Sequence, residues 1–216
     1  MKKLFLYLVV LFLFFACSFD TPPNEWQFKS INAFDSYQKN FLSSNDTLAK
    51  NDLSRAIKHA KSSDDLTTLA RIYLGECALN ISVGISDKCE NYEKISSLIK
   101  DETLNSYFLF INKQSSDDSL KLLPKQYKNF SRYLKEQDYK KANETLREIK
   151  EATSMFLCTA ILEDSADDES IDKVISTASL YGYKKVVIYW LNIKKNRTFD
   201  SIQKEKIARK ISILGS

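Results

Sequence analysis

The chain has 216 residues and a formal net charge of +4, with only four glycines and three prolines. So few turn-forming residues argue against a β-rich protein and against glycine-rich loops that cradle phosphates. The small net charge gives no bulk argument for nucleic-acid binding, and the composition favours helices joined by short polar loops.

The N-terminus has the pattern of a secretory signal. Lys2 and Lys3 precede an uninterrupted apolar run over residues 4–15, which corresponds to the charged and apolar regions of a leader peptide. The run is shorter than the roughly 20 apolar residues that a membrane-spanning helix needs. We therefore predict that residues 1–16 are a cleaved signal peptide, and loss of Lys2 and Lys3 takes the net charge from +4 to +2.

The junction that follows is Phe14-Phe15-Ala16-Cys17, and it resembles the lipobox of bacterial prolipoproteins. Ala16 and Cys17 match that family's pattern, whereas Phe14 and Phe15 stand where the family usually has Leu and a small or β-branched residue. The resemblance implies that Cys17 becomes the N-terminus and carries the lipid. The alternative is an ordinary signal peptide followed by a chance cysteine.

The residues after the cysteine bear on localisation. Residues 17–24 form the lipidated N-terminus and a short tether that contains two prolines. The family uses aspartate directly after the cysteine to retain a protein at the inner membrane, and here that residue is Ser18. In a bacterium with two membranes the resemblance therefore implies anchoring in the outer membrane, and we expect the chain to face the periplasm rather than the cell surface.

Residues 25–216 carry apolar side chains at helical spacing, and no stretch alternates convincingly with a period of two. The pattern predicts one all-α domain of about ten helices, arranged as stacked helical hairpins or as an irregular α-bundle. We expect Gly182 to cap the helix that precedes it. The apolar stripes fall within residues 26–41, 53–60, 66–79, 92–99, 104–111, 127–134, 139–149, 155–162, 171–178, 186–190 and 202–214.

The segment 129–146 resembles a tetratricopeptide repeat (TPR). Its matching residues are Tyr133, Tyr139, Ala142 and Leu146, whereas Phe130 and Gln137 occupy positions where that family has glycine. The resemblance implies a TPR-like helical hairpin, and a stack of such hairpins would form a curved solenoid whose concave face binds other proteins.

Three cysteines remain after Cys17. Cys77 and Cys89 flank a segment that contains Gly84 and is typical of a turn between two helices. In an oxidising compartment we expect these two to form a disulfide, with three free thiols as the alternative. Cys158 lies within an apolar helical stretch and is expected to be a small buried side chain.

The chain offers little that is typical of catalysis or metal binding. His59 is the single histidine, so no zinc motif is present, and we expect it to be solvated. The acidic run over residues 163–172 has no glycine and no regular ligand spacing, which favours a solvated helix start over a calcium loop. Glu169-Ser170 is similar to the Glu-Ser pair of lytic transglycosylases, but the glycine-rich motifs around that pair are missing. We predict no catalytic residue, no metal and no cofactor.

The C-terminal segment is basic. Residues 181–216 contain nine Lys or Arg against Asp200 and Glu205 alone. These bases either complement the acidic run upstream or form a face for an anionic partner. The candidate partner surface comprises Lys184, Lys185, Lys194, Lys195 and Arg197.

These observations predict a non-catalytic adaptor or scaffold held at the outer membrane through Cys17. Its expected partners are the membrane, through the lipid, and another envelope protein, with no nucleic acid. The alternatives are a surface-exposed adhesin or antigen, and an envelope enzyme acting on the cell wall through Glu169.

Overall fold

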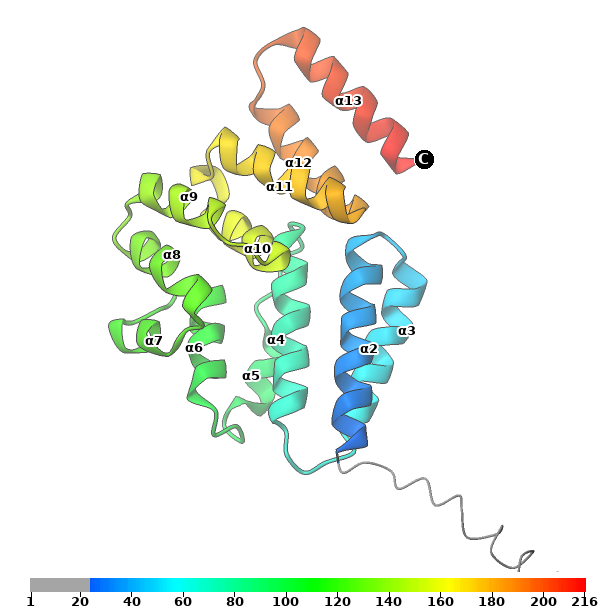
Figure 1. Ribbon diagram of the computed structural model, residues 1–216, viewed down its shortest axis with the longest axis vertical. Helices are drawn as coiled ribbons and strands as arrows, with labels where there is room; N and C mark the ends of the chain where they lie inside the picture. The colour runs from blue at the N-terminus through cyan, green and yellow to red at the C-terminus, as the bar shows by residue number, and fades with distance from the viewer. Residues whose placement is uncertain (1–23) are drawn as a thin grey trace, which may run out of the picture.

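The computed structural model describes residues 24–216. The predicted signal peptide, Cys17 and the tether up to residue 23 lie outside the described residues. Within residues 24–216 the chain forms twelve α-helices and one 3-10 helix and contains no strand. The predicted all-α fold class is therefore confirmed, and the helices form a bundle of helical hairpins (Figure 1).

The elements follow one another with short connections. They are α2 (Glu25–Leu42), α3 (Asp46–Ala60), α4 (Thr67–Ser82), α5 (Glu90–Ser96), α6 (Glu102–Ile111), α7 (Asp117–Leu122), α8 (Lys125–Lys135), α9 (Tyr139–Arg147), α10 (Ala152–Leu162), η1 (Glu163–Ser165), α11 (Asp168–Tyr181), α12 (Lys184–Arg197) and α13 (Ser201–Gly215).

Two helices form the centre of the bundle. Of the eleven residues of α10, nine are buried, and α4 buries side chains all around its axis, from Thr68 to Ser82. A helix that is apolar all round must be enclosed by other elements, and α10 packs on α4, α8, α9 and α11. Cys158 lies fully buried in α10 as a free thiol.

The α2–α3 hairpin packs beside α4 through small residues (Figure 1). Ala33, Ala56 and Ala60 are buried there, which lets the helix backbones approach closely. Gly75 of α4 faces the Phe34 ring of α2, and a Cβ at Gly75 would come within 2.4 Å of that ring. A side chain at this position would therefore displace the Phe34 ring.

Helices α8 and α9 form the hairpin that the TPR resemblance implied. Phe130, Ala142 and Leu146 are fully buried, whereas Tyr139 is 42% exposed. Gln137, at the place where the family has glycine, adopts a left-handed conformation with φ of 57°. The hairpin geometry is present, and membership of the TPR family stays a prediction.

The structure differs from the predicted elements in two places and agrees with the predicted cap in a third. The six-residue helix α7 was not expected, because it is too short to show periodicity. Leu98 and Ile99 lie beyond the end of α5, and Leu98 is 67% exposed. Gly182 caps α11 in the left-handed conformation, with φ of 70°, as predicted.

The aromatic centre of the bundle gives a test of the packing. Phe130 is fully buried, and its ring lies edge-on to Phe110 with 6.1 Å between centroids. Truncating it would leave a cavity that the rigid neighbours cannot fill. We expect Phe130→Ala to lower the free energy of unfolding by about 3–5 kcal/mol in urea denaturation. Phe28→Ala, at a site that is 66% exposed, should change it by less than about 0.5 kcal/mol. Equal effects of the two variants would contradict this packing.

Candidate functional site

A cavity of about 350 Å³ lies where the ends of α6, α8 and α10 meet. We call it the turn cavity. One wall is apolar and the other is polar. The apolar wall consists of Phe110, Leu134, Ile161 and Leu162. The polar wall includes Lys113, Ser115, Ser131, Lys135, Gln137, Glu163 and Ser165.

Three residues of this cavity have an unusual backbone conformation. Lys113, Gln137 and Glu163 have φ values of 59°, 57° and 52°, in a region that side chains other than glycine rarely occupy. Lys113 and Gln137 end α6 and α8, where the amides beyond them donate back into the helix: Gln114 to Leu109 O at 2.7 Å, and Asp138 to Tyr133 O at 2.9 Å. These bonds are typical of a left-handed helix end.

Glu163 is the most strained of the three. Its φ and ψ of 52° and −124° belong to a turn position that is usually glycine. A strained residue persists only where its surroundings hold it, and here Arg197 does so. The Arg197 guanidinium donates to Glu163 O at 3.0 Å and to Ala166 O, and so spans the turn that contains η1.

Both lysines of the turn cavity form ion pairs with carboxylates. Lys113 Nζ lies 2.7 Å from Glu163 Oε1, and Lys135 Nζ lies 2.6 Å from Asp117 Oδ1. The Ser115 hydroxyl oxygen is buried and has no hydrogen-bond partner among the described residues. The cavity thus combines two ammonium groups, a buried hydroxyl and an apolar wall, a set that can bind a small anionic molecule.

Most residues of the predicted partner surface bind other residues of the same chain. Lys185 pairs with Asp46 of α3, and Lys194 pairs with Asp172 of α11. Arg197 holds the η1 turn and lies 3.8 Å from Asp164. Lys195 donates to Asn192 at 3.3 Å, and Lys184 has no ion-pair partner among the described residues. The five residues therefore do not form one free cationic surface, because the acidic run packs beside them.

The unpaired bases lie instead on α13. Lys204, Lys206, Arg209 and Lys210 are exposed, and none forms an ion pair within residues 24–216. Ile207 is buried against the body, whereas Ile202 and Ile213 are 65% and 66% exposed. The predicted stripe wrongly placed Ile202 with Ile207, because α13 has two apolar faces rather than one.

The spacing of these residues in the sequence could have revealed the second apolar face of α13. Ile202, Lys206, Arg209 and Ile213 follow one another at helical intervals and share the side opposite to Ile207. A small hollow of about 290 Å³ lies on α13, and its lining residues include Lys206, Arg209, Lys210 and Ile213. Phe199, just before the helix, is fully exposed. We call the set Phe199, Ile202, Lys206, Arg209, Lys210 and Ile213 the α13 face.

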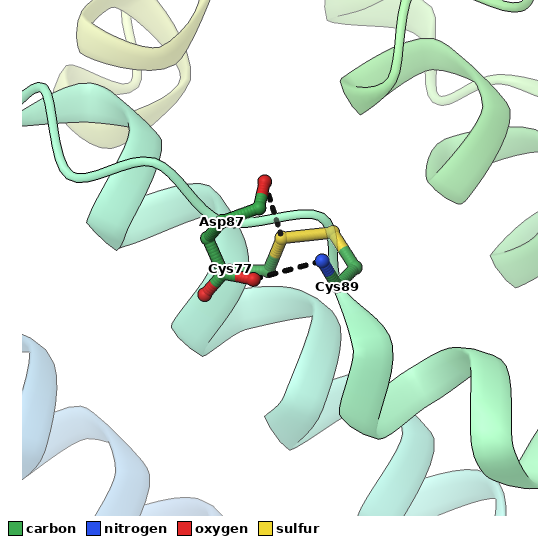
Figure 2. A group of neighbouring side chains, drawn as sticks. All are labelled: Cys77, Asp87 and Cys89. Carbon is green, nitrogen blue, oxygen red and sulfur yellow. Dashed lines mark hydrogen bonds between the residues drawn. A yellow bond between two sulfur atoms is a disulfide. The ribbon is translucent and has the colours of Figure 1, made fainter.

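The structure joins Cys77 and Cys89 by a disulfide with a Cα–Cα distance of 5.2 Å. Cys77 lies in α4, which continues to Ser82, so the turn between the cysteines is shorter than the sequence suggested. Cys89 has a φ of 59°, and Asp87 supports it by accepting from the Cys89 amide at 2.8 Å (Figure 2). The disulfide thus fixes the start of α5 against α4.

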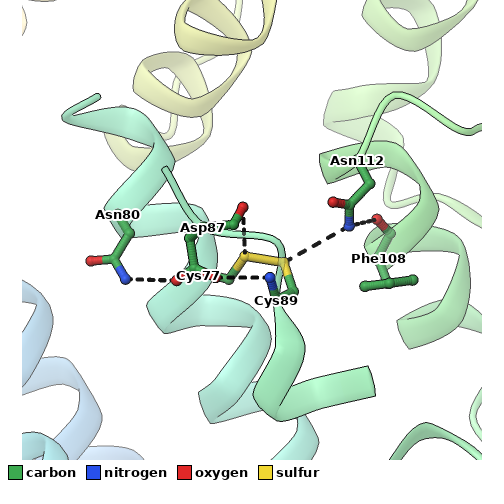
Figure 3. The surroundings of a disulfide bond; sticks show 6 residues. All are labelled: Cys77, Asn80, Asp87, Cys89, Phe108 and Asn112. Atoms are coloured by element: carbon green, nitrogen blue, oxygen red, sulfur yellow. Dashed lines mark hydrogen bonds between the residues drawn. A yellow bond between two sulfur atoms is a disulfide. The ribbon is translucent and has the colours of Figure 1, made fainter. Parts of the chain in front are cut away.

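Neighbouring amides complete this region. Asn80 donates to the second oxygen of Asp87 at 2.8 Å, and Asn112 at the end of α6 donates to Phe108 O at 3.0 Å (Figure 3). Burial, and then the nearby carboxylate of Asp87, raises the pKa of Glu76. Cys77, Asp87 and Cys89 lie close enough to share a metal ion, but both sulfur atoms are committed to the disulfide.

Two other residues considered from the sequence, Glu169 and His59, lie outside the turn cavity. Glu169 is exposed, and its carboxylate lies 3.5 Å from Arg147, which also binds Asp167 at 2.8 Å. His59 is half-buried on α3.

The chain matches no protein-family model, no curated protein and no solved structure. Between residues 24 and 216, no helix combines the length and the apolar character needed to cross a membrane.

The disulfide gives a test of this region. It closes a loop with a sequence separation of 12, for which the chain-entropy model gives a stabilisation of about 3 kcal/mol. We expect the double variant Cys77→Ser, Cys89→Ser to unfold at lower urea concentration by about that free energy. Addition of a reductant should lower the melting temperature of the native protein and leave that of the double variant unchanged. Alkylation of both cysteines without reductant would rule the disulfide out.

Proposed function

We propose that this chain is a lipid-anchored, non-catalytic adaptor of the outer membrane, and that its α13 face binds an acidic segment of another envelope protein. One observation carries the proposal. The exposed basic and apolar residues of α13 lie at the far end of the molecule from the start of α2, where the tether joins the helical body (Figure 1).

The tether sets how the body is presented. The resemblance to a lipobox puts the lipid on Cys17, and the first helix begins at Glu25. A fully extended chain spans at most about 3.5 Å per residue, so this connection reaches about 25–30 Å. A body held so closely at the α2 end would direct α13 away from its own membrane and toward the periplasm.

The chemistry of the α13 face selects the kind of partner. On this face the charged side chains of Lys206, Arg209 and Lys210 lie beside the exposed apolar side chain of Ile213. An amphipathic helix with acidic residues beside its apolar stripe would pack on this face, with its carboxylates against the basic side chains. A second copy of this chain would bring like charges together, which disfavours self-association through this face.

The adaptor proposal predicts crosslinking from α13. A photoreactive residue in place of Ile213, in cells that carry the lipidated protein, should capture a protein through an acidic segment identified by mapping the crosslinked peptide. The same group in place of Leu98, which is equally exposed but lies after α5, should not capture it. Crosslinks to lipid or cell-wall material alone would overturn the proposed partner.

Charge reversal on α13 gives a matched test of affinity. We expect the double variant Lys206→Glu, Arg209→Glu to weaken binding of the captured protein by about tenfold or more, because attraction becomes repulsion. Lys58→Glu, Lys61→Glu reverses two exposed charges on and beside α3 and should leave binding unchanged. Equal loss in both double variants would indicate a nonspecific charge effect and contradict a site on α13.

The anchor is tested separately. We expect Cys17→Ser to move the protein from the membrane fraction to the soluble fraction, because the lipid is the proposed attachment. Retention of the variant at membranes would contradict lipid anchoring. Protease treatment of intact cells distinguishes the orientations, since cleavage of the native protein would favour the surface-exposed adhesin over a periplasmic adaptor.

A further inference from the structure

The turn cavity already holds one carboxylate. Glu163 reaches across it to Lys113, with 2.7 Å between oxygen and nitrogen, and the two side chains are 70% and 42% exposed. An ion pair with that much contact with water contributes little stability. The carboxylate of Glu163 can therefore be exchanged for another at small cost.

The shape of the turn does not depend on this ion pair. Arg197 binds the carbonyl oxygens of Glu163 and Ala166, and the Ala166 amide donates to Glu163 O at 3.2 Å. These bonds hold the backbone, so the Glu163 side chain can swing out while the cavity wall stays in place.

Two further polar side chains, those of Ser115 and Lys135, line the cavity together with Lys113. The Ser115 hydroxyl is buried and has no partner among the described residues, although a buried hydroxyl is normally hydrogen-bonded. Lys135 adds a second ammonium group, and its one carboxylate partner, Asp117, is 85% exposed. A carboxylate has two acceptor oxygens, which suit an ammonium and a hydroxyl together.

The size and the apolar wall restrict the rest of the ligand. The volume of about 350 Å³ is at the lower end of the range for small-molecule pockets. Phe110, Leu134, Ile161 and Leu162 are among its lining residues and give a limited apolar surface. The cavity therefore suits a small molecule with aliphatic groups beside its carboxylate, such as the C-terminal end of a short peptide with small side chains.

We propose that the turn cavity binds a small aliphatic carboxylate, which takes the place of Glu163 on Lys113. The internal carboxylate then acts as a competitor that the ligand must displace. This inference depends on neither the lipid anchor nor the α13 face, so it can fail or hold independently of the adaptor function.

The test uses a matched pair of ligands and the full mature chain. N-acetyl-alanyl-alanine with a free carboxylate should shift the backbone amide resonances of Lys113, Ser115 and Gln137 saturably in a nitrogen-proton correlation spectrum. The corresponding C-terminal amide, which lacks the charge, should not. Identical saturable shifts with both compounds, or no saturable shift by about 50 mM of the acid, would overturn the proposal.

Three single variants test the roles of Lys113 and Glu163 in binding the acid. Lys113→Gln should raise the dissociation constant of the acid about tenfold or more, because the charge-assisted bond is lost. Glu163→Gln should lower it by about threefold or more, because the competing carboxylate is removed. Lys150→Gln, at an exposed lysine outside the cavity, should leave it unchanged.

The variants also exclude a structural explanation. A merely destabilised protein would lose affinity in both Lys113→Gln and Glu163→Gln, whereas the proposal requires opposite changes. The same dissociation constant in Lys113→Gln as in the native protein, or a weaker one in Glu163→Gln, would overturn it. Circular dichroism spectra that match the native one establish that each variant is folded.

Discussion

The rest of this structure depends on the packing of α10 against α4. Helix α10 buries nine of its eleven residues, and α4 buries side chains on several sides of its axis, so the two helices form the centre of the core. Glu151 accepts from the amides of Thr153 and Ser154 at the start of α10, and the apolar run ends at Leu162. The chain leaves the core directly after Leu162, through the strained turn at Glu163.

The turn cavity is a consequence of that geometry. Helices α6, α8 and α10 end near one another because their apolar faces share one core, and each end reverses direction through a residue with positive φ. Polar side chains from three turns then meet beside an apolar wall. The same turn binds Arg197, so the end of α12 and the cavity wall are fixed by one side chain.

The sequence predicts those parts of the molecule that depend on local pattern. Helical periodicity identified α10 and the α8–α9 hairpin, and the expected cap at Gly182 is present. The turn cavity depends on residues such as Lys113 and Glu163, which are far apart in the chain and carry no shared motif. Their left-handed conformations have no sequence signal, because glycine would be expected there. Gln137 was the partial exception, since the TPR resemblance marked its position as a turn.

Charge illustrates the same limit in a different way. The sequence shows the net charge of the C-terminal segment, but it does not show which of the basic side chains are neutralised by ion pairs. The acidic run after α10 lies against α12, so Lys194 and Arg197 form ion pairs within the fold, and most of the unpaired charge is left on α13. Ile207 is the only residue of α13 that is fully buried, and a helix of this length is marginal by itself in water. An acidic partner that covered Ile202 and Ile213 would bury the apolar surface that the body leaves exposed. Binding at the α13 face would then stabilise α13 itself, a terminal helix that the body covers on one side only.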